Sequence, residues 1–130
     1  MAVTSYRGLQ VWQKATDLVV ECYRLTALLP KSELYGLASQ IQRAAVSVPA
    51  NIAEGHGREH LGDYLHHLSV ANGSLMELET HLLIAVRLAY VEERRLAPVL
   101  ALSAEVGRML SGLTKSLKKN TQGKHLTPNT

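Results

Sequence analysis

A stripe of polar residues runs through the largely apolar segment 37–55, whose sequence is LASQIQRAAVSVPANIAEG. The steps along the stripe are three, four, four and three, so its members share one face of a helix. They are Gln40, Arg43, Ser47, Asn51 and Glu54. A solvated face accepts almost any polar residue, whereas this mixture of amide, guanidinium, hydroxyl and carboxylate groups is typical of a buried hydrogen-bond network.

Such a network needs partners from a second helix. If the next helix folds back on this segment, Arg43 lies near Glu77 and can form a forked ion pair with it. Ser74 can then join Ser47 in the same network. We interpret the network as a structural element that fixes the register of the two helices, in preference to a catalytic or ligand site.

Positive charge is concentrated at the C-terminal end of the chain. The net charge is +3, yet up to residue 112 ten lysines and arginines stand against eleven acids. The excess comes from Lys115, Lys118, Lys119 and Lys124. A solvated tail is one explanation, and attraction to RNA or DNA is the other. No aromatic residue accompanies the lysines, which disfavours the stacking that single-strand binders use.

Other candidate chemistry is sparse. His60, Asp63 and His67 share a helical face at steps of three and four, a spacing that suits metal ligands but equally an ordinary solvated surface. Cys22 falls on the apolar seam of a helix with no activating base in sight. The chain has no phosphate-binding glycine loop and no nucleophile elbow. We therefore expect no catalytic residue, no bound metal and no cofactor, and predict that the protein is not an enzyme.

Apolar residues recurring at three and four predict the helices that position these groups. The expected ranges are Leu9–Leu29, Ser32–Glu54, His60–Tyr90 and a fourth helix that begins close to Leu96 and ends near Lys119. Pro49 can either kink the second helix or split it, and we favour the kink because the polar stripe keeps its phase. The sequence predicts an all-α, antiparallel up-down four-helix bundle over residues 1–119, followed by a flexible tail over residues 120–130.

Two details of the helices carry further expectations. Gly73 lies inside the third helix, where it indicates close approach of a neighbouring backbone. Val11, Leu18 and Leu25 lie outside the main seam of the first helix, and the resulting broad apolar face favours a contact between subunits.

Composition limits the class of protein. The length of 130 residues suggests one domain, and 46% apolar residues are enough for a core that must be mostly aliphatic, because Phe is absent. One cysteine and the lack of a signal peptide favour a cytoplasmic location. The longest pure apolar run, residues 82–86, is too short to cross a bilayer, so we expect no membrane partner.

Three stretches carry a resemblance to a known family. They are LASQIQRAAVSVPANIAEG, ANGSLMELETHL at residues 71–82, and the opening YRGLQVWQKA. Together they make residues 6–118 similar to the four-helix-bundle proteins encoded by 23S rRNA intervening sequences. Departures are mild: Tyr6 and Tyr64 stand where the family often has Phe, and Asn72 where it often has Arg.

The resemblance implies a homopentameric ring from a bacterial genome, encoded inside an rRNA gene or standing alone. A related bundle assists the reverse transcriptase of diversity-generating retroelements. We therefore expect a non-enzymatic oligomer that binds RNA or DNA with low specificity through its basic surface. The alternative is a protein-interaction scaffold, or a reverse-transcriptase accessory with no direct role on nucleic acid.

Overall fold

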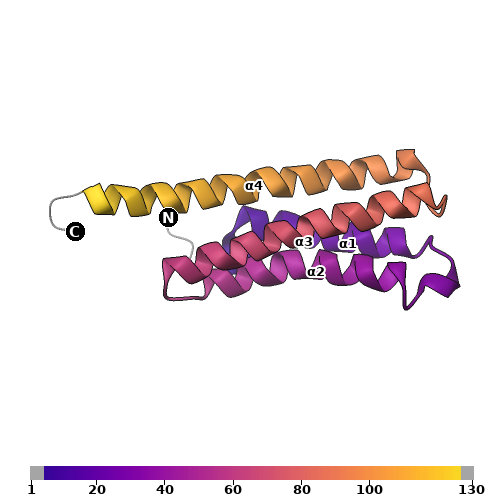
Figure 1. Cartoon of the computed structure of the whole chain (residues 1–130), viewed down its shortest axis with the longest axis horizontal. Coiled ribbons are helices and arrows are strands. Elements are labelled where there is room, and N and C mark those ends of the chain that lie inside the picture. Colours follow the sequence, from indigo (N-terminus) through magenta and orange to yellow (C-terminus); the bar gives the residue numbers. More distant parts are fainter. Residues whose placement is uncertain (1–4, 127–130) are drawn as a thin grey trace.

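The computed structural model describes residues 5–126, with side chains described through residue 120, and is helical throughout its regular elements (Figure 1). The elements in order are the 3-10 turn Tyr6–Gly8, α1 Gln10–Thr26, the 3-10 turn Lys31–Glu33, α2 Leu37–His56, α3 Leu61–Arg87 and α4 Glu93–Leu126. Within the described residues there is no strand. The predicted all-α four-helix bundle is confirmed.

Each helix packs against its neighbours in the chain, and α4 closes the bundle against α1. The α2–α3 contact is the most extensive, and α4 is held less closely, by α1 and α3. The core is aliphatic, with Leu18, Ile41, Leu75, Leu78 and Val106 completely buried. Short connections between successive antiparallel helices explain this up-down arrangement.

The apolar face of α1 is used inside the chain. Val11, Leu18 and Leu25 are at most 4% exposed and belong to the core. The expectation that these residues serve a subunit contact is therefore wrong, because α1 packs against both α2 and α4 and needs a wide apolar stripe for two neighbours. The large apolar side chains that α1 does expose are Val20 and Tyr23.

Helix α2 begins later than its sequence suggests. Glu33 lies in the preceding 3-10 turn, where one carboxylate oxygen accepts a hydrogen bond from the Leu37 backbone N–H at 3.0 Å. The other oxygen accepts one from the Tyr90 hydroxyl at 2.9 Å. These two bonds, the backbone one foremost, hold the pKa of Glu33 below its usual value. Glu33 thus caps α2 from outside and ties its start to the α3–α4 connection.

Two prolines lie inside helices. Helix α2 continues through Pro49, so the alternative of two shorter helices is excluded, while the kink itself remains a prediction. Helix α4 begins at Glu93, earlier than the expected start close to Leu96, so Pro98 lies beyond its first turn. The helix also continues past Lys119 to Leu126, so the tail expected from residue 120 is partly helical. Gly123 does not stop it, and residues 127–130 lie outside the described part of the chain.

By length and composition alone, residues Glu93–Asn120 of α4 are long and apolar enough to cross a membrane. Part of this character comes from the bundle core, which contains Leu96, Val99, Val106 and Leu110, while 28% of the apolar stretch is buried. The outer side of the helix carries alanines, including Ala97, Ala101 and Ala104, which raise hydropathy without exposing large side chains. A core helix meets the same criterion as a membrane span.

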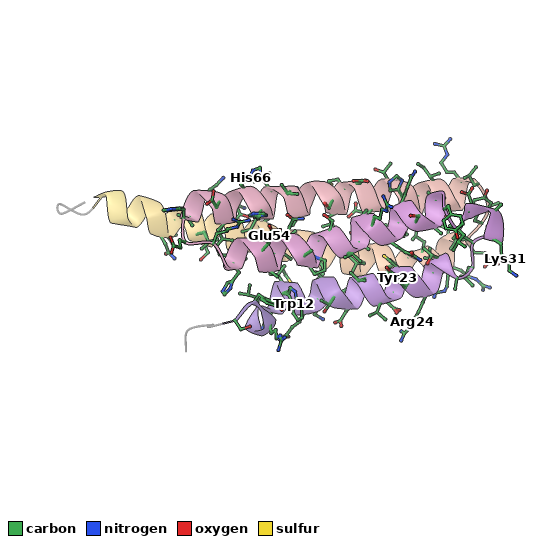
Figure 2. All side chains as sticks on the ribbon, turned by 90° about the horizontal axis from the view of Figure 1, so that it is seen from below. Trp12, Tyr23, Arg24, Lys31, Glu54 and His66 are labelled. Atoms are coloured by element: carbon green, nitrogen blue, oxygen red, sulfur yellow. The ribbon has the colours of Figure 1, made fainter. Side chains whose placement is uncertain are left out.

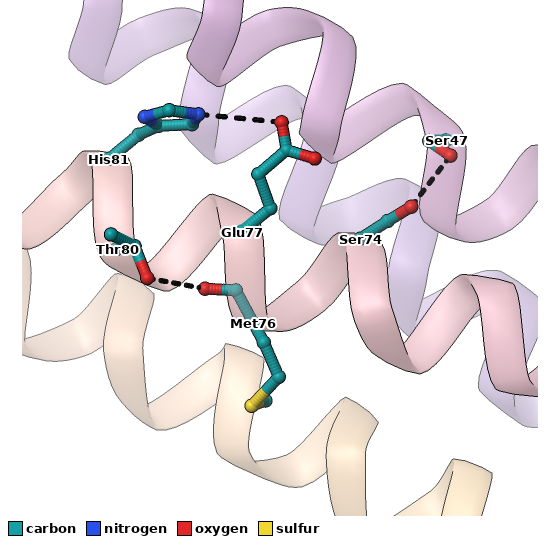
Figure 3. Close-up of polar contacts among 6 residues, drawn as sticks. All are labelled: Ser47, Ser74, Met76, Glu77, Thr80 and His81. Carbon is teal, nitrogen blue, oxygen red and sulfur yellow. Dashed lines mark hydrogen bonds and ion pairs between the residues drawn. The ribbon is translucent and has the colours of Figure 1, made fainter.

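A chain of hydrogen bonds joins α2 to α3. The Asn51 side-chain amide donates to the Ser47 backbone carbonyl at 2.8 Å and to the Ser47 hydroxyl at 3.1 Å. The Ser47 and Ser74 hydroxyls lie 2.8 Å apart (Figure 3). Because its amide nitrogen serves Ser47, Asn51 offers its oxygen to His67 Nδ1 at 3.1 Å, and that ring nitrogen must carry the proton.

The expected buried pair of Arg43 and Glu77 is wrong. Arg43 is exposed and has no hydrogen bond or ion pair with the residues that the structure describes. The Glu77 side chain is 60% exposed and turns toward His81 Nε2, 3.4 Å away (Figure 3). Gln40 and Glu54 are exposed as well, and Glu54 pairs with Arg58 at 3.0 Å. The polar stripe therefore contributes to the α2–α3 interface only at its centre, through Ser47 and Asn51.

Close helix approach occurs at Gly55, near the α2–α3 turn. A Cβ added at Gly55 would lie 2.7 Å from His67 Cβ and 3.1 Å from Tyr64 Cδ1. At Gly73 an added Cβ would meet nothing within 4 Å, so the expectation of close approach there is wrong. Gly73 faces outward, and its sequence position alone does not reveal which side of α3 it occupies.

The two glycines should respond oppositely to alanine. Gly73→Ala should stabilise the protein by about 1 kcal/mol, since alanine is the better helix former at an exposed position. Gly55→Ala should destabilise it by about 1–3 kcal/mol, because the methyl group overlaps His67. Urea midpoints at one protein concentration measure both changes, and equal shifts of the same sign would contradict this packing.

The polar chain gives a second matched pair. Asn51→Ala should cost about 1–3 kcal/mol of unfolding free energy, because His67 and Ser47 lose a half-buried partner. Arg43→Ala should cost under about 0.5 kcal/mol, as expected for an exposed side chain. Chemical unfolding of both variants is the test. A larger loss from Arg43→Ala would restore the buried ion pair that the sequence indicates.

Candidate nucleic-acid interface

The predicted nucleic-acid-binding lysines gather on the last third of α4. Lys115, Lys118 and Lys119 are exposed, and Lys124 lies in the final turns of the same helix, beyond the described side chains. All of them occupy the end of the bundle that also holds the α2–α3 turn. The sequence-based grouping of these lysines thus falls on one continuous helix.

Helix α4 projects past its neighbours at this end (Figures 1 and 2). Ser103 donates a hydrogen bond to Glu79 at 2.6 Å. One turn further along α4, a Cβ added at Gly107 would lie 3.4 Å from a Leu75 methyl group. These two contacts define the register of α4 along α3. Extending that register places the first residue of α3, Leu61, level with residue 121 of α4. The final turn of α4 therefore has no part of α3 beside it.

A groove of about 500 Å³ runs between α3 and α4 just inside this overhang. Its floor is apolar and is formed by Leu65, Leu68 and Leu110. Its rim is polar and consists of Ser69, Asn72, Ser111, Thr114, Lys115 and Lys118. Among the described side chains that line the groove, none is acidic. The arrangement thus offers two cations and several neutral hydrogen-bonding groups around one concave surface.

The hydroxyl groups on this rim are uncommitted. Thr16, Thr26 and Thr80, elsewhere in the bundle, each donate to a carbonyl of their own helix at 2.7–2.9 Å. By contrast, the side chains of Ser69, Asn72, Ser111 and Thr114 have no hydrogen-bond partner in the described part of the chain. Their donors remain available to a ligand. The sequence shows these residues, but only the α3–α4 register reveals that they face one another.

The other candidate groups have structural surroundings. Cys22 is completely buried, and burial, with a smaller effect of Glu21, raises the pKa of its thiol to about 12, so it stays protonated at neutral pH. His67 is engaged with Asn51 rather than with His60 and Asp63. In the described residues no group of three or more His, Cys, Asp or Glu side chains could hold a metal ion.

His81 is a polar residue that sequence reasoning leaves without a role. Its Nε2 faces Glu77, while its Nδ1 is buried without a hydrogen-bond partner in the described structure. When Nε2 donates a hydrogen bond to the carboxylate, Nδ1 carries a lone pair and is an acceptor. Burying an acceptor without a hydrogen-bond partner costs less free energy than burying an N–H group without one. Figure 3 shows the pair on the side of α3 that faces α2, and neither residue lines the α3–α4 groove.

Comparison with known proteins supports the fold and gives the family. A search among curated proteins finds no match. A crystal structure of a protein of unknown function from the S23 ribosomal protein family of Bacteroides thetaiotaomicron superposes with a TM-score of 0.75 at 24% identity, covering 81% of this chain and 98% of that one. At this identity the likeness concerns the fold alone.

The family profile described as 23S rRNA-intervening sequence protein matches residues 7–112. The match includes all of α1, α2 and α3 and the first part of α4. It ends before Lys115, so the basic end of α4 lies outside the matched region. With most of its length matched, the chain belongs to the 23S rRNA-intervening sequence protein family.

Proposed function

We propose that this protein is a non-enzymatic, oligomeric four-helix bundle that binds RNA or DNA with low sequence specificity. The observation that carries the proposal is the segregation of charge. Residues 1–112 are close to neutral, while the end of α4 carries four lysines, has no acidic residue after Glu105 and continues past the start of α3. A polyanion approaching α4 at this end meets a cationic helix segment without an acid of its own, while Glu59 and Asp63 lie at the same end of the bundle.

The expected mode of binding is contact with phosphate groups. Lysine ammonium groups act as point charges that release counterions from the nucleic-acid backbone, a contribution that does not depend on sequence. Tyr64, the aromatic residue of α3 nearest in register to Lys118, is half-buried and packs edge-on against His56. It is therefore not available as an open stacking platform, which favours backbone contact over base readout.

Self-association is the second part of the proposal. Val20 and Tyr23 of α1 and Val46 of α2 are 42–49% exposed, and Tyr23 and Val46 line a shared groove. At the far end of the bundle Tyr35 is 92% exposed. Exposed apolar surface of this kind is typical of subunit contacts. The family resemblance implies a pentamer, in which the same lysines recur on each subunit and bind with avidity.

The alternative function is a protein-interaction scaffold, or a reverse-transcriptase accessory that does not itself touch nucleic acid. The same apolar surface around Tyr23 and Val46 favours it, because that surface lies away from the lysines and could dock a protein partner. The two functions differ in one measurable respect: only the first requires the basic end of α4.

Neutralising the lysines of α4 should abolish most nucleic-acid binding. In the full-length chain, Lys115, Lys118, Lys119 and Lys124 are changed to Gln. Anisotropy of labelled RNA and DNA should show binding by the unaltered protein at about 50 mM salt, weakening steeply by about 200 mM, and little binding by the variant.

A matched control removes the same charge from the opposite end of the bundle, by changing Arg24, Lys31, Arg87 and Arg94 to Gln. These side chains are exposed, so the fold should tolerate the changes. We expect the control to bind nearly as well as the unaltered protein. If the unaltered protein ignores nucleic acid at the lower salt, the scaffold function is the better account.

Native mass spectrometry at micromolar concentration should show a single oligomeric species, expected to be a pentamer. Val46→Glu should shift it toward monomer, because a charge would be placed at the proposed contact. Met76→Glu, at a similarly exposed position on α3, is the control and should leave the oligomer intact. A monomer from the unaltered chain would refute self-association.

A further inference from the structure

The α3–α4 groove contains neutral hydrogen-bond donors in addition to its lysines. A purely electrostatic tail would need no fixed geometry and no neutral donors. Here two helices bring hydroxyl and amide groups to the rim, over an apolar floor, beside Lys115 and Lys118. These neutral groups lie inside the folded body, N-terminal to the overhang.

We propose that this groove seats a phosphate of a nucleic-acid backbone, together with its sugar. The inference rests on the proposed nucleic-acid function and names the place where the folded body takes part in it. Lys115 and Lys118 supply the positive charge, and Asn72, Ser111 and Thr114 supply the neutral donors.

The spacing along each helix fits a single binding surface. On α3, Ser69 and Asn72 are three residues apart, and on α4, Ser111, Thr114 and Lys118 follow at steps of three and four. Each set therefore lies on one face of its helix, and the groove brings the two faces together. A volume of about 500 Å³ falls in the range of small-molecule sites and is ample for a sugar-phosphate unit.

The floor of the groove strengthens the polar contacts. Leu68 and Leu110 are at most 2% exposed and belong to the bundle core. Apolar surface beneath a bound phosphate excludes water from one side, and hydrogen bonds from charged or neutral donors gain strength where the local dielectric is low. The sugar can pack on Leu65, the half-buried residue of the floor, without any contact to a base.

A nucleic-acid backbone suits the groove better than a free anion does. Beyond the groove α4 continues toward its overhanging end, with Lys119 exposed beside the start of α3 and Lys124 following in the same helix. A strand whose one phosphate sits in the groove can place neighbouring phosphates along these lysines. Inorganic phosphate would make contacts only inside the groove, so it should bind far more weakly than a nucleic-acid strand does.

Two serines of α4 provide a matched test. Ser111 lines the groove, whereas Ser116 is also exposed and does not line it. Ser111→Asp and Ser116→Asp change the net charge identically and lie on either side of Lys115. With labelled oligouridine, Ser111→Asp should weaken binding about tenfold more than Ser116→Asp, because it places a carboxylate against the bound phosphate. Circular dichroism and thermal midpoints confirm that both variants fold.

Salt dependence separates the neutral donors from the lysines. The double variant Asn72→Ala, Thr114→Val should bind more weakly with an unchanged salt slope, since no charge is lost. Lys115→Gln should lower the slope by about 0.7 for a single strand, the loss of one phosphate contact.

Each failure has a distinct pattern. No binding by the unaltered protein refutes the proposed function, and the groove with it. Equal effects of Ser111→Asp and Ser116→Asp, in a protein that does bind, overturn the groove and leave the lysines acting alone. Displacement of oligouridine by inorganic phosphate at an equal concentration of phosphate groups would overturn the nucleic-acid assignment and make the groove a free-anion site.

Discussion

The close approach of α2 and α3 at Gly55 is the constraint on which the other contacts depend. The absence of a side chain there lets the His67 side chain and the Tyr64 backbone come near, and His67 Nδ1 lies within 3.1 Å of Asn51. The resulting bonds reach Ser47 and Ser74 and hold the two helices in one register. A single missing methyl group thus permits both the tight packing and the polar chain.

This register passes to the rest of the bundle through α3. Helix α4 takes its place along α3 from the bond between Ser103 and Glu79 and from the contact of Gly107 with Leu75. Because α3 begins at Leu61 while α4 continues to Leu126, the two helices cannot end together, and α4 must overhang. The same register aligns Asn72 with the region of Leu110 and so creates the groove between them.

The sequence predicts the fold well because aliphatic periodicity is set by local geometry. It predicts less where two helices must be known at once. Arg43 and Glu77 are opposite in charge and suitably placed along a hairpin, but rotation of each helix turns both side chains to solvent. Gly73 looks like a packing glycine, yet faces outward, while Gly55 resembles a helix stop and is the site of close contact. In each case the unknown quantity is the angle of a residue about the helix axis relative to its partner.

The extent of the family match can be compared with the packing of the bundle. The family match covers residues 7–112, the part whose side chains build the core and its register. Among the described side chains beyond residue 112, Leu113 and Leu117 pack against the core as partly buried residues, and the exposed positions around them can carry charge. The groove lies on this boundary: its α3 rim and Leu110 belong to the matched bundle, whereas Thr114, Lys115 and Lys118 lie beyond it. A basic extension placed there gains the rigidity of the bundle, and a phosphate bound at the boundary would meet donors held in fixed positions rather than on a flexible tail.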